Sequence, residues 1–354
     1  MRKRKFLTDC LCAVGCMVLV SAVIGCTGSG KEAEAGPVPE LGRSYAKDEV
    51  HALAEAADKT AVWSVYWDSA DTMSVLRSER ESIQAVSLFE AYFKDDEVVI
   101  PEASEKMLSQ IRNREATKDM TVFLSVVNDV DQNGTIVQKD TGILKKCLGT
   151  KEAARAHAEN LVEIVSERGY DGIEIDYEKI RSDQELWADF LQFEQFLLEE
   201  AAGKDLKVRI ILEPSTPVEE LEFPDGAEYV VMCYNLYGNG TEPGPKADAD
   251  FLRKMYDRFG NLPEISYAFA DGGYDWEADS KKAQQLRASE AAALIETYEA
   301  EPVRDEASGV LYFEYTKGGK KHTVWYADEE TLKIWADWLR EWGADPLRVS
   351  LWRL

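Results

Sequence analysis

The segment Asp171–Glu178 constrains the fold of this chain more than any other. It reads Asp-Gly-Ile-Glu-Ile-Asp-Tyr-Glu, and its β-branched residues with an acid at every second position predict a strand. Because successive side chains of a strand point to opposite faces, the acids at 174, 176 and 178 share one face. The other face is apolar and can pack against a layer of helices. The position between helical patterns favours an interior parallel strand, and an edge strand with one wet face is the alternative.

The three acids on this strand also predict chemistry. Like charges at this spacing cannot all stay ionised on a buried strand, so at least one acid should hold its proton near neutral pH. A carboxylic acid kept protonated in this way can serve as a general acid. The segment therefore indicates an acid-catalysed reaction at the end of a buried strand.

Strand-like runs alternate with helical patterns from about residue 46, as in a parallel α/β fold. The eight runs lie near 61–67, 84–89, 120–127, 172–178, 207–213, 229–235, 264–269 and 347–352. This number predicts a (β/α)8 TIM barrel over residues 46–354. The gap before the last run is longer than one helix needs, and Lys317-Gly-Gly-Lys320 within it is a hairpin signal. We therefore expect a small α+β insertion at about 283–330.

The N-terminus indicates secretion. Basic residues 2–5 precede an apolar run over 10–25, which is shorter than the roughly 20 residues that a bilayer-spanning helix needs. The run ends Val-Ile-Gly-Cys, which looks like a bacterial lipobox with Cys26 as the lipid acceptor. We expect a signal peptide at 1–25, a flexible tether at 26–45, and a lipid anchor on the extracytoplasmic face of the cell membrane. An uncleaved anchor helix is the alternative.

The segment Asp171–Glu178 resembles the Asp-x-x-Asp-x-Asp-x-Glu signature of glycoside hydrolase family 18, the chitinase-like barrels. The resemblance implies that Glu178 protonates the glycosidic oxygen. It also implies that Asp176 orients the substrate's 2-acetamido group, whose carbonyl oxygen is the nucleophile in this family's substrate-assisted route. Glu174 stands where most members carry Asp or Asn, and it is expected among the substrate-binding residues.

Two further segments resemble the family's site. The sixth run ends Met232-Cys-Tyr234-Asn235, close to the family's Met-x-Tyr-Asp, which implies that Tyr234 donates to the acetamido carbonyl. Met232 and Asn235 are then substrate-binding residues, with Asn235 replacing the usual Asp. Trp352 at the end of the last run resembles the aromatic pocket floor under the sugar ring. Weaker candidates for the pocket walls are Tyr66, Trp67, Phe89 and Trp276.

Metal and cofactor sites are not expected. Residues 129–140 have the oxygen spacing of a calcium loop, but they follow a strand and end in Asp, so an acidic surface loop is the preferred interpretation. The histidines at 51, 157 and 322 are scattered and predict no zinc site. Cys147 and Cys233 are interpreted as plain buried thiols, with a disulfide as the alternative.

The net charge of the chain limits the classes of partner that it can bind. A net charge of -25 argues against nucleic acid and against electrostatic attachment to anionic membranes. The expected partner is an N-acetylglucosamine-containing polysaccharide, bound by a monomer. Because of the anchor and the insertion type, cell-envelope peptidoglycan is favoured over chitin or N-linked glycans, and an endo-acting N-acetylglucosaminidase or chitinase is expected.

Two other hypotheses stay open. One is a two-carboxylate retaining glycosidase in which Glu213 is the nucleophile, because that mechanism needs a second carboxylate about 5 Å from the acid. The other is a catalytically weak or inactive, membrane-anchored glycan-binding protein, because a fold and a pocket do not guarantee turnover.

Overall fold

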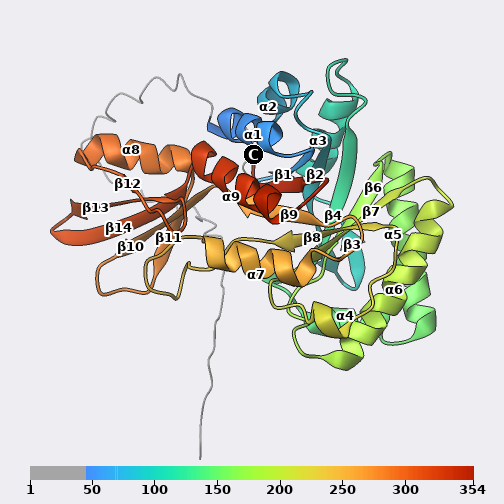
Figure 1. The fold of residues 1–354 in the computed structure, drawn as a ribbon. Helices are drawn as coiled ribbons and strands as arrows, with labels where there is room; N and C mark the ends of the chain where they lie inside the picture. The colour runs from blue at the N-terminus through green and yellow to red at the C-terminus, as the bar shows by residue number, and fades with distance from the viewer. Residues whose placement is uncertain (1–44, 68, 70) are drawn as a thin grey trace, which may run out of the picture.

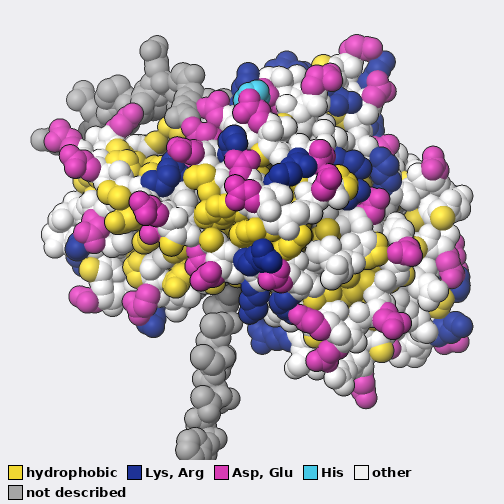
Figure 2. Space-filling model, in the orientation of Figure 1, with side chains coloured by type: hydrophobic (Ala, Val, Ile, Leu, Met, Phe, Trp, Pro, Cys, Tyr) yellow, Lys and Arg dark blue, Asp and Glu magenta, His cyan; other side chains and the backbone are white. Residues whose placement is uncertain are grey.

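The computed structural model describes residues 45–67, 69 and 71–354. The expected signal peptide, Cys26 and the expected tether lie outside these residues, apart from Tyr45, which begins helix α1 (Tyr45–Ala56). Within the described residues, no helix combines the length and the apolar character needed to span a membrane. On the face shown in Figure 2, acidic side chains are spread widely, as the net charge of -25 leads one to expect.

A closed barrel of parallel strands forms the main body of the molecule (Figure 1). Its strands are β1 (Lys59–Val65), β2 (Ala85–Lys94), β4 (Thr121–Gln132), β6 (Gly172–Asp176), β7 (Lys207–Leu212), β8 (Ala227–Met232), β9 (Ser266–Ala270) and β15 (Arg348–Trp352). Strand β1 pairs with β15, the last strand, and β2 pairs with β4, which closes the sheet. All eight expected runs are strands, so the predicted (β/α)8 barrel is confirmed.

Helices follow most of the strands and cover the outside of the barrel (Figure 1). They are α2 (Thr72–Ser78), α3 (Glu102–Arg112), α4 (Thr141–Leu148), α5 (Lys151–Arg168), α6 (Gln184–Ala202), α7 (Ala249–Phe259) and α9 (Glu329–Trp342), with a 3-10 turn η1 (Val218–Glu220) between β7 and β8. The sequence sets the ends of α5. The Thr150 side chain accepts from the backbone N–H of Ala153, and Gly169 takes the left-handed conformation that ends the helix.

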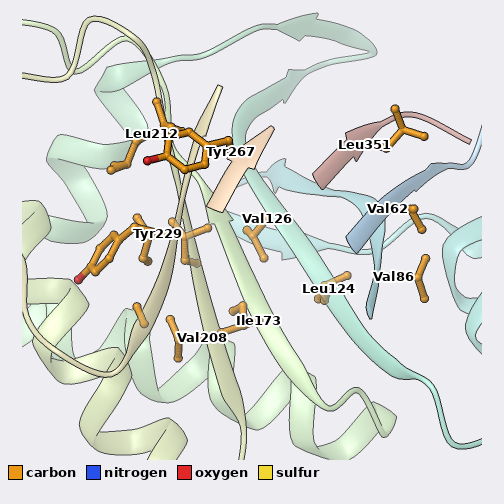
Figure 3. Close-up of a cluster of buried hydrophobic side chains, with 14 of the residues drawn as sticks. Val62, Val86, Leu124, Val126, Ile173, Val208, Leu212, Tyr229, Tyr267 and Leu351 are labelled. Carbon is orange, nitrogen blue, oxygen red and sulfur yellow. The ribbon is translucent and has the colours of Figure 1, made fainter. Parts of the chain in front are cut away.

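The core lies between the strands and these helices. Figure 3 shows outward-pointing apolar side chains from neighbouring strands, among them Val86, Leu124 and Ile173, gathered into one cluster. Ile173 and Ile175 on β6 are 0% exposed, so the expected apolar face of this strand is buried. With that face fixed against the helices, the alternating acids of β6 turn to the inside of the barrel.

The chain between β9 and β15 forms a second sheet, which stands beside the barrel (Figure 1). It contains β10 (Gly272–Glu277), β11 (Ala283–Leu286), β12 (Val303–Arg304), β13 (Leu311–Lys317) and β14 (Lys320–Ala327), with α8 (Ala288–Tyr298) against it. The sequence predicted the insertion from about residue 283, but the sheet begins at Gly272. The earlier start was missed because a single residue separates β10 from β9, so the two strands look like one in the sequence. Gly272 permits the bend, since its φ is 59° and a Cβ there would lie 2.2 Å from the Leu286 carbonyl oxygen.

Two short strands extend the barrel strands beyond its rim. Strand β3 (Glu97–Val99) forms a hairpin with β2, and β5 (Thr135–Val137) forms one with β4. The β4–β5 hairpin covers most of the segment with calcium-loop spacing. Its residues 132–136 are exposed, as expected for a surface loop, whereas Asp129 and Asp131 are buried.

Candidate active site

A cleft of about 2060 Å³ opens at the carboxyl ends of the barrel strands. The β4–β5 hairpin and the second sheet deepen it, since both contribute lining residues. Most of the residues expected from the sequence line this one cleft, namely Asp176, Glu178, Met232, Tyr234, Asn235 and Trp352. The barrel thus brings together residues from β6, β8 and β15 that are far apart in the chain.

Glu178 lies just beyond the end of β6 and is partly open to the cleft, with 23% of its side chain exposed. Asn128 fixes its backbone, because the Asn128 side chain accepts from the Glu178 N–H at 3.0 Å and donates to the Glu178 carbonyl at 3.1 Å. The Glu178 Oε1 atom contacts the Lys139 Nζ atom at 2.8 Å. Glu178 is therefore a carboxyl group held in one place at the floor of a large cleft.

Asp176 sits next to Glu178 and deeper in the barrel, with 6% of the residue exposed. Its Oδ2 lies 3.5 Å from Lys139 Nζ, while its Oδ1 is buried and has no hydrogen-bond partner among the described residues. Burial raises the pKa of Asp176 well above its usual range, although Lys139 partly opposes this. At least one acid of the motif thus favours its protonated form, as the sequence predicted.

Lys139 and Asp129, both on the β4–β5 hairpin, complete the cluster and were not foreseen as site residues. Asp129 is 4% exposed, and its Oδ1 accepts from the backbone N–H of Lys139 at 3.0 Å. The interpretation of residues 129–140 as a surface loop is wrong for Asp129, because the hairpin folds back over the barrel. The other acids are engaged too, since Asp131 pairs with Lys94 at 2.9 Å and Asp140 caps α4. In the described part of the chain, no group of His, Cys, Asp and Glu side chains is placed to hold a metal ion.

Lys139 carries a positive charge in the cleft. Burial alone would lower the pKa of Lys139, but the carboxylates of Asp176 and Glu178 outweigh burial and raise it well above the usual value. A protonated ammonium therefore lies among the acids of the cleft.

Glu174 lies beneath the cleft and not in it, which corrects its expected role in substrate binding. It is 0% exposed, and protein donors occupy both carboxylate oxygens. These donors are Trp63 Nε1 at 2.6 Å, Ser125 Oγ at 2.7 Å, Ser87 Oγ at 2.8 Å and Arg209 Nη1 at 2.9 Å. Because the glutamate side chain is longer than an aspartate, it reaches Arg209 on β7 and forms a buried ion pair with it.

Glu90 and Glu213 also line the cleft. Burial raises the pKa of Glu90, beyond the middle of β2, to about 7. Glu213 follows β7, and burial together with the charge of Glu178 raises its pKa. The Glu213 Oε2 atom accepts a hydrogen bond of 2.8 Å from the backbone N–H of Lys179.

A sequence model of the family described as Glycosyl hydrolases family 18 matches residues 62–352 of the chain. The chain belongs to this family. It is a glycoside hydrolase, and the matched range begins in β1 and ends with β15. The motif Asp171–Glu178 and its place at the end of the fourth barrel strand fit the family's architecture.

Several known proteins are similar to this family 18 chain. The uncharacterized glycosylase YvbX of Bacillus subtilis (strain 168) is 23% identical over 295 residues, covering 78% of this chain and 83% of that protein. The spore cortex-lytic enzyme SleL of Bacillus megaterium QM B1551 has a similar fold, with a TM-score of 0.69, 16% identity and coverage of 84% and 70%. A chitinase from Chromobacterium violaceum ATCC 12472 also has this fold, with a TM-score of 0.68, 23% identity and coverage of 84% and 94%.

Aromatic side chains form much of the apolar surface of this family 18 cleft. Trp352 packs edge-on against Phe89, with ring centroids 4.9 Å apart, and both line the cleft. Tyr66 and Trp67 stand at the rim and are 40% and 42% exposed. Trp276 does not line the cleft. It is 1% exposed, because its position on β10 turns the ring into the interior.

The cysteines and histidines of the described residues do not line the cleft. Cys147 and Cys233 are free thiols, and burial raises the pKa of Cys147 to about 12. His157 shares a hydrogen bond of 2.7 Å with the Tyr177 hydroxyl behind β6. His322 contacts Asp275 in the second sheet, and His51 pairs with Glu55 on α1.

Proposed function

We propose that this family 18 enzyme is a retaining, substrate-assisted glycosidase that cleaves glycans containing β-linked N-acetylglucosamine. The observation that carries the proposal is the orphaned Asp176 Oδ1, a buried acceptor without a partner among the described residues, next to Glu178. A buried acceptor left unpaired costs free energy, and an amide N–H arriving in the cleft supplies the missing bond. A 2-acetamido group carries such an N–H beside the bond to be cleaved.

Each residue then has a chemical role. Glu178 donates its proton to the glycosidic oxygen, and the acetamido carbonyl oxygen attacks the anomeric carbon, displacing the leaving group. Asp176 accepts from the acetamido N–H and stabilises the positive charge of the cyclic intermediate. Tyr234 donates to the acetamido carbonyl, and Trp352 supports the sugar ring. Water then opens the intermediate, with Glu178 taking the proton of that water.

Two properties of Glu213 argue against the two-carboxylate alternative. Its Oε2 is engaged by the Lys179 N–H and is not free to attack, and burial and the charge of Glu178 raise its pKa even though that hydrogen bond lowers it, so the nucleophilic carboxylate form is disfavoured. In addition, the raised pKa of Asp176 disfavours a free carboxylate there before substrate arrives. Neither acid has the environment of an ionised nucleophile.

A thiazoline analogue of N-acetylglucosamine, which mimics the cyclic intermediate, should bind more tightly than the free sugar, by at least about 10²-fold. Asp176→Asn should reduce this preference, because the positively charged ring loses its carboxylate partner. Inhibition constants for the analogue and the sugar, measured on both proteins, check this. A glycosyl-enzyme ester trapped on Glu213 with a 2-fluoro sugar would instead support the two-carboxylate mechanism.

For the natural substrate we propose cell-envelope peptidoglycan. The fold similarity to SleL, which is named a spore cortex-lytic enzyme, and the similarity to the glycosylase YvbX support this choice over chitin. The cleft is large enough for several sugar units, which suits an endo-acting enzyme. Mass spectrometry of products from purified peptidoglycan, chitin oligomers and an N-glycosylated protein tests the proposal, and release from chitin alone would contradict it.

The proposed location is the outer face of the cell membrane, with lipid on Cys26. Cys26→Ser should release the protein from membranes if the lipid on Cys26 is its anchor, and within the described residues no helix is long and apolar enough to cross a membrane. Partitioning of wild type and variant into a detergent phase measures this. Persistence of the variant in the detergent phase would indicate an uncleaved anchor helix.

A further inference from the structure

Lys139 occupies a position that the proposed reaction does not explain. Its Nζ lies 2.8 Å from Glu178 Oε1, 3.5 Å from Asp176 Oδ2 and 3.7 Å from Asp129 Oδ1, and 16% of the side chain is exposed. An ammonium in contact with a proton donor favours the ionised form of that donor, which opposes general acid catalysis. We therefore expect the contact with Lys139 to help the proton donor in another way, which offsets this effect.

The two oxygens of Glu178 have different surroundings. Oε1 accepts from Lys139, while Oε2 has no hydrogen bond to any of the described residues. The side chain lines the cleft, so Oε2 is the oxygen available to a substrate. An ammonium has three donors and no acceptor, and the carbonyl oxygen of a protonated carboxyl group accepts more strongly than its hydroxyl oxygen. The contact of Oε1 with Lys139 therefore favours the form of Glu178 whose proton is on Oε2.

We propose that Lys139 is a positioning residue of the proton donor, which holds the Glu178 carboxyl by Oε1 and directs its proton to Oε2, toward the glycosidic oxygen. The inference rests on the proposed role of Glu178 and adds a residue outside the signature. The backbone supports this role, because Asp129 accepts from the Lys139 N–H and anchors the residue at the end of the β4–β5 hairpin.

Several charged groups surround this pair, and they set the pH dependence together. The acids are Asp129 on β4, Glu90 on β2, Glu174 and Asp176 on β6, and Glu213 after β7, and the other basic residues that line the cleft are Lys179, Arg181 and Lys246. Glu174 is paired with Arg209, and within the described part of the chain Lys139 forms the ion pairs with Asp129, Asp176 and Glu178. Removal of its charge should keep the proton on the Asp176 and Glu178 pair to a higher pH.

The test is the pH profile of kcat/KM for Lys139→Met on an N-acetylglucosamine oligomer. We expect the basic limb, where activity falls as the donor loses its proton, to move upward by about one to three pH units. We also expect kcat at the optimum to fall about tenfold with little change in KM, because the carboxyl is no longer held in the productive orientation. Lys139→Arg keeps the charge and should leave the basic limb in place.

Lys94→Met is the matched control, because Lys94 pairs with Asp131 of the same hairpin but does not line the cleft. Its basic limb should stay at the wild-type pH. A fixed or downward-shifted limb in a folded Lys139→Met protein overturns the proposal, as does an equal shift in Lys94→Met.

A second readout does not need turnover. The ¹³C carboxyl signal of Glu178, assigned by its loss in Glu178→Gln, should titrate at higher pH in Lys139→Met than in wild type. A shifted signal without hydrolysis of any N-acetylglucosamine substrate would contradict the proposed function and leave the role of Lys139 standing. An unshifted signal in an active enzyme would contradict only the role of Lys139.

Discussion

Glu178→Gln should abolish turnover while leaving the fold intact. The amide is nearly isosteric with the carboxyl group, and the backbone of Glu178 stays fixed by Asn128. The variant has no proton to give to the leaving oxygen, so the expected loss in kcat is at least about 10²-fold and up to about 10⁴-fold. Initial rates on a chromogenic N-acetylglucosamine oligomer measure the loss, and a thermal melt establishes that the variant is folded.

Glu213→Gln is the matched variant for this experiment, because Glu213 is another partly buried glutamate near Glu178 in the cleft. Its loss in kcat should be much smaller. Normal activity in a folded Glu178→Gln protein would show that Glu178 is not the donor. A wild-type protein whose melting temperature rises with the sugar, but which releases no product, would instead be the glycan-binding protein of the alternative hypothesis.

The barrel could be predicted because local sequence and fold agree over its strands. Each barrel strand is a short apolar run, and each intervening helix has its own period, as Lys151–Arg168 shows for α5. Strand β10 was missed because Asp271 alone separates it from β9, so no turn signal marks the change of sheet. The acids on β6 could be placed because a period of two assigns faces without any knowledge of the partners.

The partners of those acids were not predictable by the same reasoning. Lys139 contacts Glu178 from the β4–β5 hairpin, and the path of this hairpin depends on the folded barrel. In the sequence, the acids of this hairpin have the spacing of a calcium loop. Arg209 did leave a signal, because a single arginine inside the run Lys-Val-Arg-Ile-Ile-Leu of β7 must be paired if the strand is buried. That signal points to a buried carboxylate, and Glu174 was the unexplained acid on the neighbouring strand.

Arg209→Met should destabilise the protein by about 3–5 kcal/mol, because it leaves the Glu174 carboxylate buried without its counter-ion. The side chains of Arg209 and Glu174 are 1% and 0% exposed, so water cannot replace the lost charge. The guanidinium also donates to Ser350 Oγ at 2.7 Å and lies between the rings of Trp63 and Phe123 at 5.3 and 5.4 Å. Methionine fills part of this space, so the loss reflects mainly the uncompensated charge. Chemical denaturation of wild type and variant measures it.

The double variant Glu174→Gln/Arg209→Met separates charge from packing. It removes both charges, and the amide can still accept from Trp63 Nε1 and one serine, so its stability should lie closer to that of wild type than Arg209→Met does. Equal stability of the single and double variants would show that the pair contributes little beyond packing. Glu174 and Arg209 are thus coupled in this protein, since each supplies the counter-ion of the other in the buried interior. Because protein donors occupy both oxygens of Glu174 beneath the cleft, Asp176 and Glu178 are the acids of the motif that line it.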